Sequence, residues 1–309
     1  MTWPACAPEL QVRTTADGSF SLFSRRFGEA FHAAGGALGE ARQTFVGPAE
    51  LERFGAGTTL VVLDVCVGTG SNTAALIEAC ARGGLCLQWR GLELDPHPLQ
   101  LALADQGFCG QWRPGALDPL RQLATSGRWR SALGAGELLW GDARRRMPAL
   151  LDELGGQVDL VLMDAFSPRH CPELWTLQFL GALAALLAPQ GRLLTYCSAA
   201  AVRAALQQAG LQLAAMSGPQ GRWSGGTAAS PGPLLLHPST GASSGPWLRA
   251  LTAMEREHLR TNAAVPYSDP SGQASAAHIL QERSARQRDC SQEGGLEPTS
   301  ASRRRWGLG

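Results

Sequence analysis

The sequence predicts an α/β fold built around a doubly wound, mostly parallel sheet. Between about residues 59 and 217, short continuous apolar runs alternate with stretches of helical periodicity. This alternation is typical of parallel strands joined by crossover helices. The length of 309 residues and the 44% share of hydrophobic residues are sufficient for one large domain with a buried core.

Five strands and their connecting helices follow in order along this region. The first strand is expected at residues 59–67, where TLVVLDVCV is a continuous apolar run, and the first helix at 72–82. The other strands are expected at residues 88–94, 137–141, 158–164 and 191–197, and the other helices at 96–106, 173–187 and 199–209. Residues 107–136 are expected to form an irregular insertion. This βαβ order predicts a sheet with helices on both faces.

The charge and cysteine content exclude several function classes. All 27 Lys and Arg positions are arginine, so Schiff-base chemistry and a Walker-A phosphate loop, which need a lysine, are excluded. The formal net charge of +1 excludes a globally basic mode of nucleic-acid binding but leaves local patches open. The eight cysteines show no metal-ligand spacing, which predicts reduced thiols and no metal. No signal peptide or membrane-spanning run is recognisable, so we expect a cytoplasmic protein.

A glycine-rich turn follows the first expected strand. It contains Asp64, Gly68, Thr69, Gly70 and Asn72. Glycines at this point let the backbone approach a ligand and leave the amides at the start of the next helix free as donors. The dinucleotide fingerprint requires a third glycine where this chain has a threonine, so a nicotinamide or flavin site is disfavoured.

Acidic residues end the next two strands. Glu93 closes the second strand, 23 residues after the last glycine of the turn, where an acidic side chain accepts hydrogen bonds from a ribose diol. Asp142 and Ala143 follow the third strand. Because nucleoside ligands bind along the carboxyl edge of such sheets, the turn and the two acidic residues together predict an S-adenosylmethionine pocket.

The end of the fourth strand carries a family resemblance. Asp164, Phe166, Pro168, Pro172 and Trp175 match an Asp-Gly/Ala-Phe-x-Pro-x-x-x-Pro-x-x-Trp pattern. Together with DVCVGTGSN, this stretch resembles the methyltransferases that finish 5-methylaminomethyl-2-thiouridine at the tRNA wobble position, namely the MnmC methyltransferase domain and its stand-alone MnmD relatives. Segments at residues 15–45 are also similar to that family, and AAVPYSDP at 263–270 is similar to cyanobacterial members.

The resemblance implies a Rossmann-like class I S-adenosylmethionine-dependent methyltransferase fold and an activity. The methyl group would go to the aminomethyl nitrogen of 5-aminomethyl-(2-thio)uridine in the anticodon region of tRNA. Asp164 would be the catalytic carboxylate, because a carboxylate accepts a hydrogen bond from that nitrogen and stabilises the developing ammonium. The implied cofactor residues are Asp64, Gly68, Thr69, Gly70, Asn72, Glu93, Asp142 and Ala143. The implied substrate residues are His32, Glu40, Phe166, Pro168, Arg169 and Trp175.

Three segments follow from this interpretation. Residues 1–58 are expected to cap the substrate pocket, and 59–217 to form the methyltransferase core. Residues 218–309 are rich in Gly, Ser, Pro and Arg and are expected to form a partly disordered tail. With 10 arginines and 7 acidic residues beyond position 220, this tail could contact RNA phosphates or be a solvated linker.

Several alternatives stay open at this stage. An enzyme of the same fold could methylate another amine, on a small molecule or a protein, and a non-catalytic nucleoside-binding module could keep the same pocket. No segment reads as the flavin oxidoreductase of the bifunctional relatives, so we expect a chain that only methylates. The run Arg144–Arg146 could grip an anticodon stem or be a solvated helix start. The oligomeric state is open.

Overall fold

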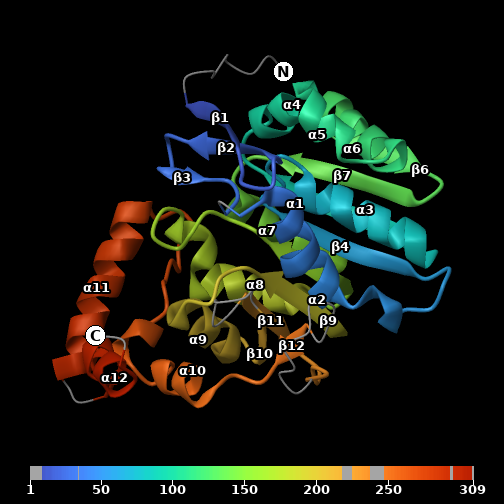
Figure 1. Ribbon diagram of the computed structural model, residues 1–309. Helices are drawn as coiled ribbons and strands as arrows, with labels where there is room; N and C mark the ends of the chain where they lie inside the picture. The colour runs from blue at the N-terminus through green and yellow to red at the C-terminus, as the bar shows by residue number, and fades with distance from the viewer. Residues whose placement is uncertain (1–8, 34, 218–224, 237–246, 293–294, 308–309) are drawn as a thin grey trace. The chain divides into compact units, whose positions relative to one another are not determined.

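The computed structural model describes residues 9–33, 35–217, 225–236, 247–292 and 295–307 (Figure 1). The chain divides into two compact units. The first comprises residues 1–146 and 158–166, and the second comprises residues 147–157 and 167–309. The expected division at residues 58 and 217 follows different limits and stays a prediction.

The first unit begins with a small antiparallel sheet. Its strands are β1 (Leu10–Thr14), β2 (Phe20–Ser24) and β3 (Glu29–Ala30). Phe20 and Leu22 alternate along β2 and are buried, as the period of two along a strand requires. Four short helical segments follow, namely α1 (Ala37–Glu40), the π-helical η1 (Ala41–Val46), α2 (Gly47–Ala49) and the 3₁₀ turn η2 (Leu51–Arg53).

The main sheet of this unit has the order β8-β4-β5-β7-β6. Its strands are β4 (Thr59–Val65), β5 (Cys86–Glu93), β7 (Gly134–Trp140), β8 (Val158–Met163) and β6 (Arg128–Ser131). All neighbouring pairs are parallel except β6 with β7. Because the chain leaves β4 toward β5 and later returns to its other side with β8, the order reverses between β4 and β8. A doubly wound sheet binds ligands at this switch point, so the predicted fold class is confirmed and the ligand edge is located.

The main sheet of the first unit is accompanied by α3 (Ser71–Gly83), α4 (His97–Ala104), α5 (Gln106–Gly110) and α6 (Pro114–Ser126), and α7 (Ala143–Leu154) leads into the second unit. The helices expected at 72–82 and 96–106 correspond to α3 and α4, whereas none of the expected helices lies at the position of α7. The expectation of an irregular insertion at 107–136 was wrong, since this region forms α5, α6 and β6. Buried residues at 116, 117, 120 and 123 have helical spacing, but Pro114, Gly115 and Pro119 made the stretch look like a loop.

The described residues of the second unit form helices around an antiparallel sheet of order β9-β11-β10-β12. The strands are β9 (Leu187–Thr195), β10 (Gln212–Met216), β11 (Gly226–Ser230) and β12 (Leu248–Arg249). The helices are η3 (Pro172–Trp175), α8 (Leu177–Leu186), α9 (Ala200–Gln208), α10 (Ala253–His258), η4 (Asn262–Ala264), α11 (Ala276–Gln292) and α12 (Thr299–Arg305).

The expectation that the chain beyond residue 218 has little packed core was wrong for its described residues. Strand β11 lies between β9 and β10 and is buried along its whole length. Its sequence, GTAAS, contains no large apolar side chain, so its burial leaves no hydrophobic signal. A Cβ on Gly226 would lie 2.2 Å from the carbonyl oxygen of Thr195, and small residues are therefore required there. Within the expected tail of residues 218–309, residues 218–224, 237–246, 293–294 and 308–309 lie outside the described residues.

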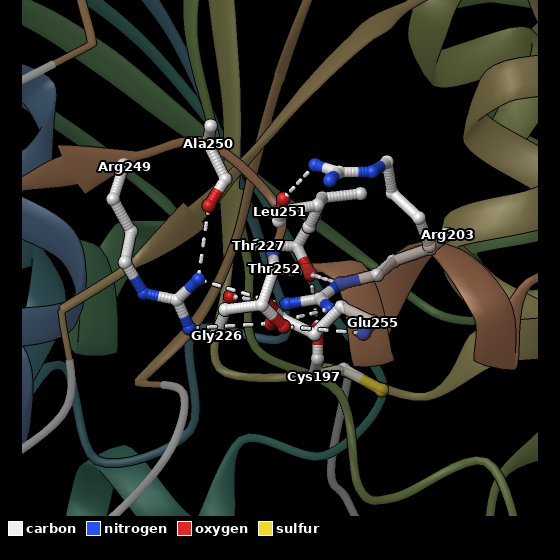
Figure 2. Close-up of polar contacts among 10 residues, drawn as sticks. Cys197, Arg203, Gly226, Thr227, Arg249, Ala250, Leu251, Thr252 and Glu255 are labelled. Carbon is white, nitrogen blue, oxygen red and sulfur yellow. Dashed lines mark hydrogen bonds and ion pairs between the residues drawn. The ribbon is translucent and has the colours of Figure 1, made fainter.

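A buried ion-pair cluster joins several elements of the second unit (Figure 2). The side chains of Arg203 and Glu255 are 2% and 0% exposed, and an Arg203 nitrogen donates to Glu255 Oε1 over 2.9 Å. Arg249 donates to the other carboxylate oxygen over 2.7 Å. Glu255 also completes a capping box with Thr252 at the start of α10. The cluster therefore links α9, β12 and α10 with each buried charge compensated.

Candidate active site

The carboxyl edge of β4 ends in a sharply turned loop. Cys66, Gly68 and Gly70 have φ angles of 66°, 57° and 84°, and α3 begins directly after them. A Cβ on Gly70 would lie 3.0 Å from Leu120 Cδ2 and 3.1 Å from Leu99 Cδ1, so α4 and α6 press directly against the loop. The predicted glycine turn is therefore present, and the region 107–136 is part of its support.

Asp64 lies beneath this loop and is completely buried. Thr73 Oγ1 donates to its Oδ2 over 2.6 Å, whereas Oδ1 has no hydrogen-bond partner among the described residues. Burial raises the pKa of Asp64 to about 7; hydrogen bonding by Thr73 and, more weakly, by the indole of Trp89 opposes this shift, and the charge of Glu93 adds to it. The loop thus covers a carboxyl group whose Oδ1 accepts no hydrogen bond of normal geometry.

Glu93 fastens the loop to the end of β5. Its Oε2 accepts from the Gly68 amide over 2.7 Å, and its Oε1 accepts from the amides of Leu94 and Asp95 over 2.7 and 3.0 Å. Burial raises the pKa of Glu93, although these backbone donors act in the opposite direction. The sequence predicted a ribose acceptor at this position and missed the loop contact. Oε2 accepts only one of these hydrogen bonds and keeps a second lone pair, so both functions are compatible.

Asp142 and Ala143 lie at the end of β7, next to the start of α7. Arg144 donates to Asp142 Oδ2 over 2.8 Å, and the Arg144 amide donates to Oδ1 over 3.0 Å. Although burial alone would raise the pKa of Asp142, the hydrogen bonds and charge of Arg144 hold it below its usual value. Arg146 donates to the carbonyl of Trp140. Two of the three consecutive arginines therefore have partners in the first unit.

Asp164 follows β8 and points toward the start of α3. Asn72 Nδ2 donates to its Oδ2 over 2.7 Å. Burial and the charges of Glu40 and Asp64 raise the pKa of Asp164 well above its ordinary value, and the Asn72 hydrogen bond acts against this shift. Glu40 itself accepts from the amide of Ala33 over 3.0 Å. The structure therefore brings together three residues that the sequence predicted separately, Glu40, Asn72 and Asp164.

His32 connects the small sheet with the glycine loop. Its Nδ1 lies 3.0 Å from Ser21 Oγ, and its Nε2 makes a longer 3.5 Å contact with Thr69 Oγ1. Burial lowers the pKa of His32 to about 4, with the charge of Asp17 opposing the shift. The imidazole is therefore neutral at pH 7 and acts as a hydrogen-bonding group.

Three phenylalanines gather beside the same loop. Phe166 stacks on Phe27 with ring centroids 4.6 Å apart, and Phe31 meets Phe166 edge-on at 5.0 Å. A Cβ on Gly68 would lie 3.3 Å from Phe31 Cδ1, which places this aromatic cluster directly against the loop. The sequence analysis identified Phe166 and missed Phe27 and Phe31. The recurrence of Phe in FSLFSRRFGEAF, just ahead of His32, is the signal that could have found them.

The remaining predicted substrate residues belong to the second unit. Pro168 is buried and Arg169 is exposed. Trp175 is completely buried, and its ring meets Tyr196 edge-on at 6.3 Å. The side chain of Trp175 packs inside the unit, and its role as a substrate residue stays a prediction. An aromatic residue in a motif gives no indication of burial, so the sequence could not separate the two roles.

Other site classes find no support among the described residues. No group of three or more His, Cys, Asp or Glu side chains in that part of the chain could hold a metal ion. No described helix is both long and apolar enough to cross a membrane.

Comparison with known proteins agrees with this geometry. Residues 131–231 match the model of a family described as S-adenosyl-L-methionine-dependent methyltransferase. Proteins named tRNA 5-methylaminomethyl-2-thiouridine biosynthesis bifunctional protein MnmC are similar over 65% of the chain, with 32% identity in Pseudomonas fluorescens and 28% in Cupriavidus necator. The chain spans about a third of the length of these relatives, 32% in both cases.

A solved structure extends the similarity to most of the chain. The crystal structure of MnmC2 from Aquifex aeolicus superposes with a TM-score of 0.74 at 25% sequence identity, covering 91% of this chain and 85% of that one. The chain is therefore similar to MnmC proteins in sequence and to MnmC2 in structure, and residues 131–231 match an S-adenosyl-L-methionine-dependent methyltransferase family.

Proposed function

We propose that this chain transfers a methyl group to the aminomethyl nitrogen of 5-aminomethyl-(2-thio)uridine at the wobble position of tRNA. One observation carries the proposal. Asp164, held by Asn72, lies at the switch point of the sheet beside both the glycine loop and the Phe166 cluster. Asp164 could thus bind the substrate amine, with the glycine loop for the cofactor on one side and the aromatic cluster for the nucleobase on the other. The names of the MnmC relatives support this substrate, and such a substrate implies a cytoplasmic protein.

The carboxylates at the loop fit the cofactor. S-adenosylmethionine, when bound, supplies a methyl group on a positively charged sulfur. Asp64 has an open buried oxygen and a raised pKa, and Glu93 and Asp164 also have raised pKa values. A cationic ligand would stabilise the ionised form of all three groups. We assign cofactor binding to Asp64, Gly68, Thr69, Gly70, Asn72, Glu93, Asp142 and Ala143.

The aromatic cluster fits a nucleobase. Phe27 and Phe166 stack on each other, so a base would have to pack against the outside of this pair; stacking on aromatic side chains contributes about 1 to 3 kcal/mol per base in single-stranded nucleic-acid sites. Neutral His32 and the carboxylate of Glu40 supply hydrogen-bonding groups nearby. Pro168 and Arg169 remain proposed substrate residues on the evidence of the sequence motif alone.

Asp164 is suited to handling the substrate amine. An aminomethyl group is largely protonated at neutral pH, and its nitrogen needs a free lone pair before it can accept a methyl group. A carboxyl group whose pKa is raised can take that proton, orient the nitrogen by a hydrogen bond and stabilise the positive charge that the nitrogen then acquires. Asn72 fixes the carboxylate in position for these steps.

Single-turnover methylation of tRNA bearing 5-aminomethyluridine tests the proposal. Asp164→Asn should reduce the rate about 100-fold to 1000-fold, because a preorganised charge is lost, while S-adenosylmethionine affinity stays nearly level. Asp118→Asn, on the exposed surface of α6, is the matched control and should behave as wild type. A variant rate near wild type contradicts the role of Asp164. Absence of tRNA methylation by the wild-type enzyme, with methylation of another amine, contradicts the substrate.

A further inference from the structure

One face of the main sheet in the first unit is open to solvent near β6. Side chains alternate between faces along a strand, and on one face Leu87, Trp89, Trp129 and Leu138 are buried. On the other face Gln88, Arg128 and Arg130 are exposed, and Arg90 and Glu137 are partly exposed. Parallel sheets are normally covered on both faces. The exposure of this face of β5, β7 and β6 to solvent is therefore unusual for a mostly parallel sheet.

Arginine dominates this face. The strand register aligns Arg90 with Glu137 and Glu137 with Arg128 across three strands, and Arg130 lies beside Ala135 in the next row. These residues line a hollow of about 400 Å³, together with Gln122 from α6. We call Arg90, Arg128, Arg130 and Glu137 the arginine face. With three cations and one carboxylate, the arginine face is positively charged.

The contacts within the arginine face leave it able to bind an anion. Arg128 donates to Glu137 Oε1 through two nitrogens, over 3.0 and 2.7 Å, yet 74% of its side chain is exposed. The Arg130 amide donates to Gln122 Oε1 over 3.1 Å, and the Arg130 side chain is exposed. Arg90 donates to the carbonyl of Trp89 over 3.3 Å. Such exposed ion pairs contribute little stability, so stabilising the fold does not account for three arginines here.

The chemistry of the arginine face favours a phosphate backbone. Guanidinium groups present a planar fork of donors that matches phosphate oxygens. A protein partner would be expected to meet several apolar or aromatic side chains at the centre of its interface. Here Trp129 is the one aromatic residue that lines the hollow, and it is buried, whereas arginine side chains are exposed around it. Arg90 is three residues before Glu93 along β5, about 10 Å from the cofactor edge, and Arg128 and Arg130 lie on β6, two strands and about 10 Å farther across the sheet. A nucleic acid whose reacting base lies at Asp164 can reach that far with its backbone.

We propose that the arginine face binds phosphates of the tRNA anticodon stem-loop whose wobble nucleotide lies in the active site. This inference rests on the proposed function, because it assigns the surface that holds the same substrate. It also gives a role to β6 and α6, which belong to the region that the sequence had presented as an insertion. Phosphate contacts of this kind position the RNA without reading its sequence.

The test compares two variants with equal loss of charge. Arg128→Gln with Arg130→Gln removes two arginines of the arginine face. Arg82→Gln with Arg121→Gln removes two exposed arginines that form ion pairs along α3 and α6. Binding of an anticodon stem-loop RNA is measured over a range of salt concentrations. The first variant should bind about tenfold more weakly and its logarithmic salt slope should fall by roughly 1.4, about 0.7 for each lost phosphate contact. The control pair should stay within about twofold of wild type.

Glu137→Gln supplies a result of opposite sign. Removing the one carboxylate of the arginine face takes away a repulsive charge and releases Arg128, so RNA affinity should rise by a few fold. A variant that merely disturbs folding cannot tighten binding. S-adenosylmethionine binding should be equal in all three variants, because none of the changed residues lies in the cofactor loop.

Methylation of two substrates separates this inference from the proposed function. In the Arg128→Gln, Arg130→Gln variant, kcat/KM for tRNA should fall about tenfold while methylation of the free 5-aminomethyluridine nucleoside is unchanged. Equal RNA binding by wild type and this variant overturns the inference, even if the enzyme methylates tRNA. An equal loss in the control pair also overturns it, because general charge would then explain the effect. RNA binding that depends on the arginine face, without any methylation of tRNA, overturns the proposed function alone.

Discussion

The two units bury charged side chains in opposite ways. In the second unit, Glu255 accepts from Arg203 and Arg249 and from a backbone amide. Burial opposes ionisation of Glu255, but these partners hold its pKa below the usual value. In the first unit, Asp64 keeps an unpartnered buried oxygen, and burial raises its pKa to about 7. A compensated charge holds a fold together, whereas an uncompensated one costs stability and is retained where a ligand supplies the missing charge.

Glu255→Gln should have the largest effect on stability. It leaves the buried Arg203 without its carboxylate partner, and breaking a buried pair in this way costs about 3 to 5 kcal/mol. Urea unfolding measures the loss. Glu282→Gln, which changes an exposed carboxylate on α11 of the same unit, is the control and should leave the unfolding curve unchanged. Wild-type stability of the Glu255 variant would show that the buried cluster does not hold the second unit together.

Asp64→Asn should change stability in the opposite direction and in a pH-dependent way. The folded pKa of about 7 lies above the unfolded value near 3.9, so the folded state binds more protons between these values. Ionisation therefore destabilises wild type as the pH rises from about 4 to 7. Relative to wild type, the variant should gain a few kcal/mol between pH 5 and pH 8, measured by urea unfolding at both values. A difference that does not depend on pH would show that Asp64 titrates normally.

The Glu93 carboxylate is intermediate between those of Glu255 and Asp64, because backbone amides, and not cationic side chains, donate hydrogen bonds to it. Glu93→Ala tests its role in cofactor binding. The variant should lose about 1 to 3 kcal/mol of S-adenosylmethionine binding free energy as hydrogen bonds to the ribose and to the Gly68 amide disappear. Calorimetric titration gives the affinity directly. Glu52→Ala, which changes an exposed carboxylate in η2, is a suitable control. Unchanged affinity in the Glu93 variant would remove Glu93 from the cofactor site.

Cys66→Gly should have the smallest effect and involves strain rather than charge. Cys66 has a φ of 66°, a conformation that costs a non-glycine residue about 1 to 2 kcal/mol. Glycine removes this cost but loses more backbone entropy on folding, about 0.5 to 1 kcal/mol. The net gain should be about 0.5 kcal/mol, seen as a small rise in Tm. A lower Tm would show that contacts of the thiol outweigh the strain.

Local sequence was sufficient to locate most of the site. The residues that end β4, β5, β7 and β8 were identified because a continuous apolar run followed by Gly, Asp or Glu marks a strand end without any knowledge of packing. Family resemblance added His32 and Glu40, whose surroundings carry no periodic signal. Phe27 and Phe31 were missed, because stacking partners distant in sequence are decided by how the small sheet meets the glycine loop. The burial of Trp175 could not be predicted from its motif either.

The sequence by itself determined the order of the parallel strands, the glycine turn and the carboxylates at the strand ends, since these depend on short-range patterns of hydrophobicity and turn residues. Only the tertiary structure decided which buried carboxylates have hydrogen-bond donors or ion-pair partners. Asp64, Glu93 and Glu255 are similar acids in the sequence, and burial together with the donors that surround each one sets their different pKa values. The same holds for β11, whose small residues became a buried central strand because β9 and β10 lie on either side of it.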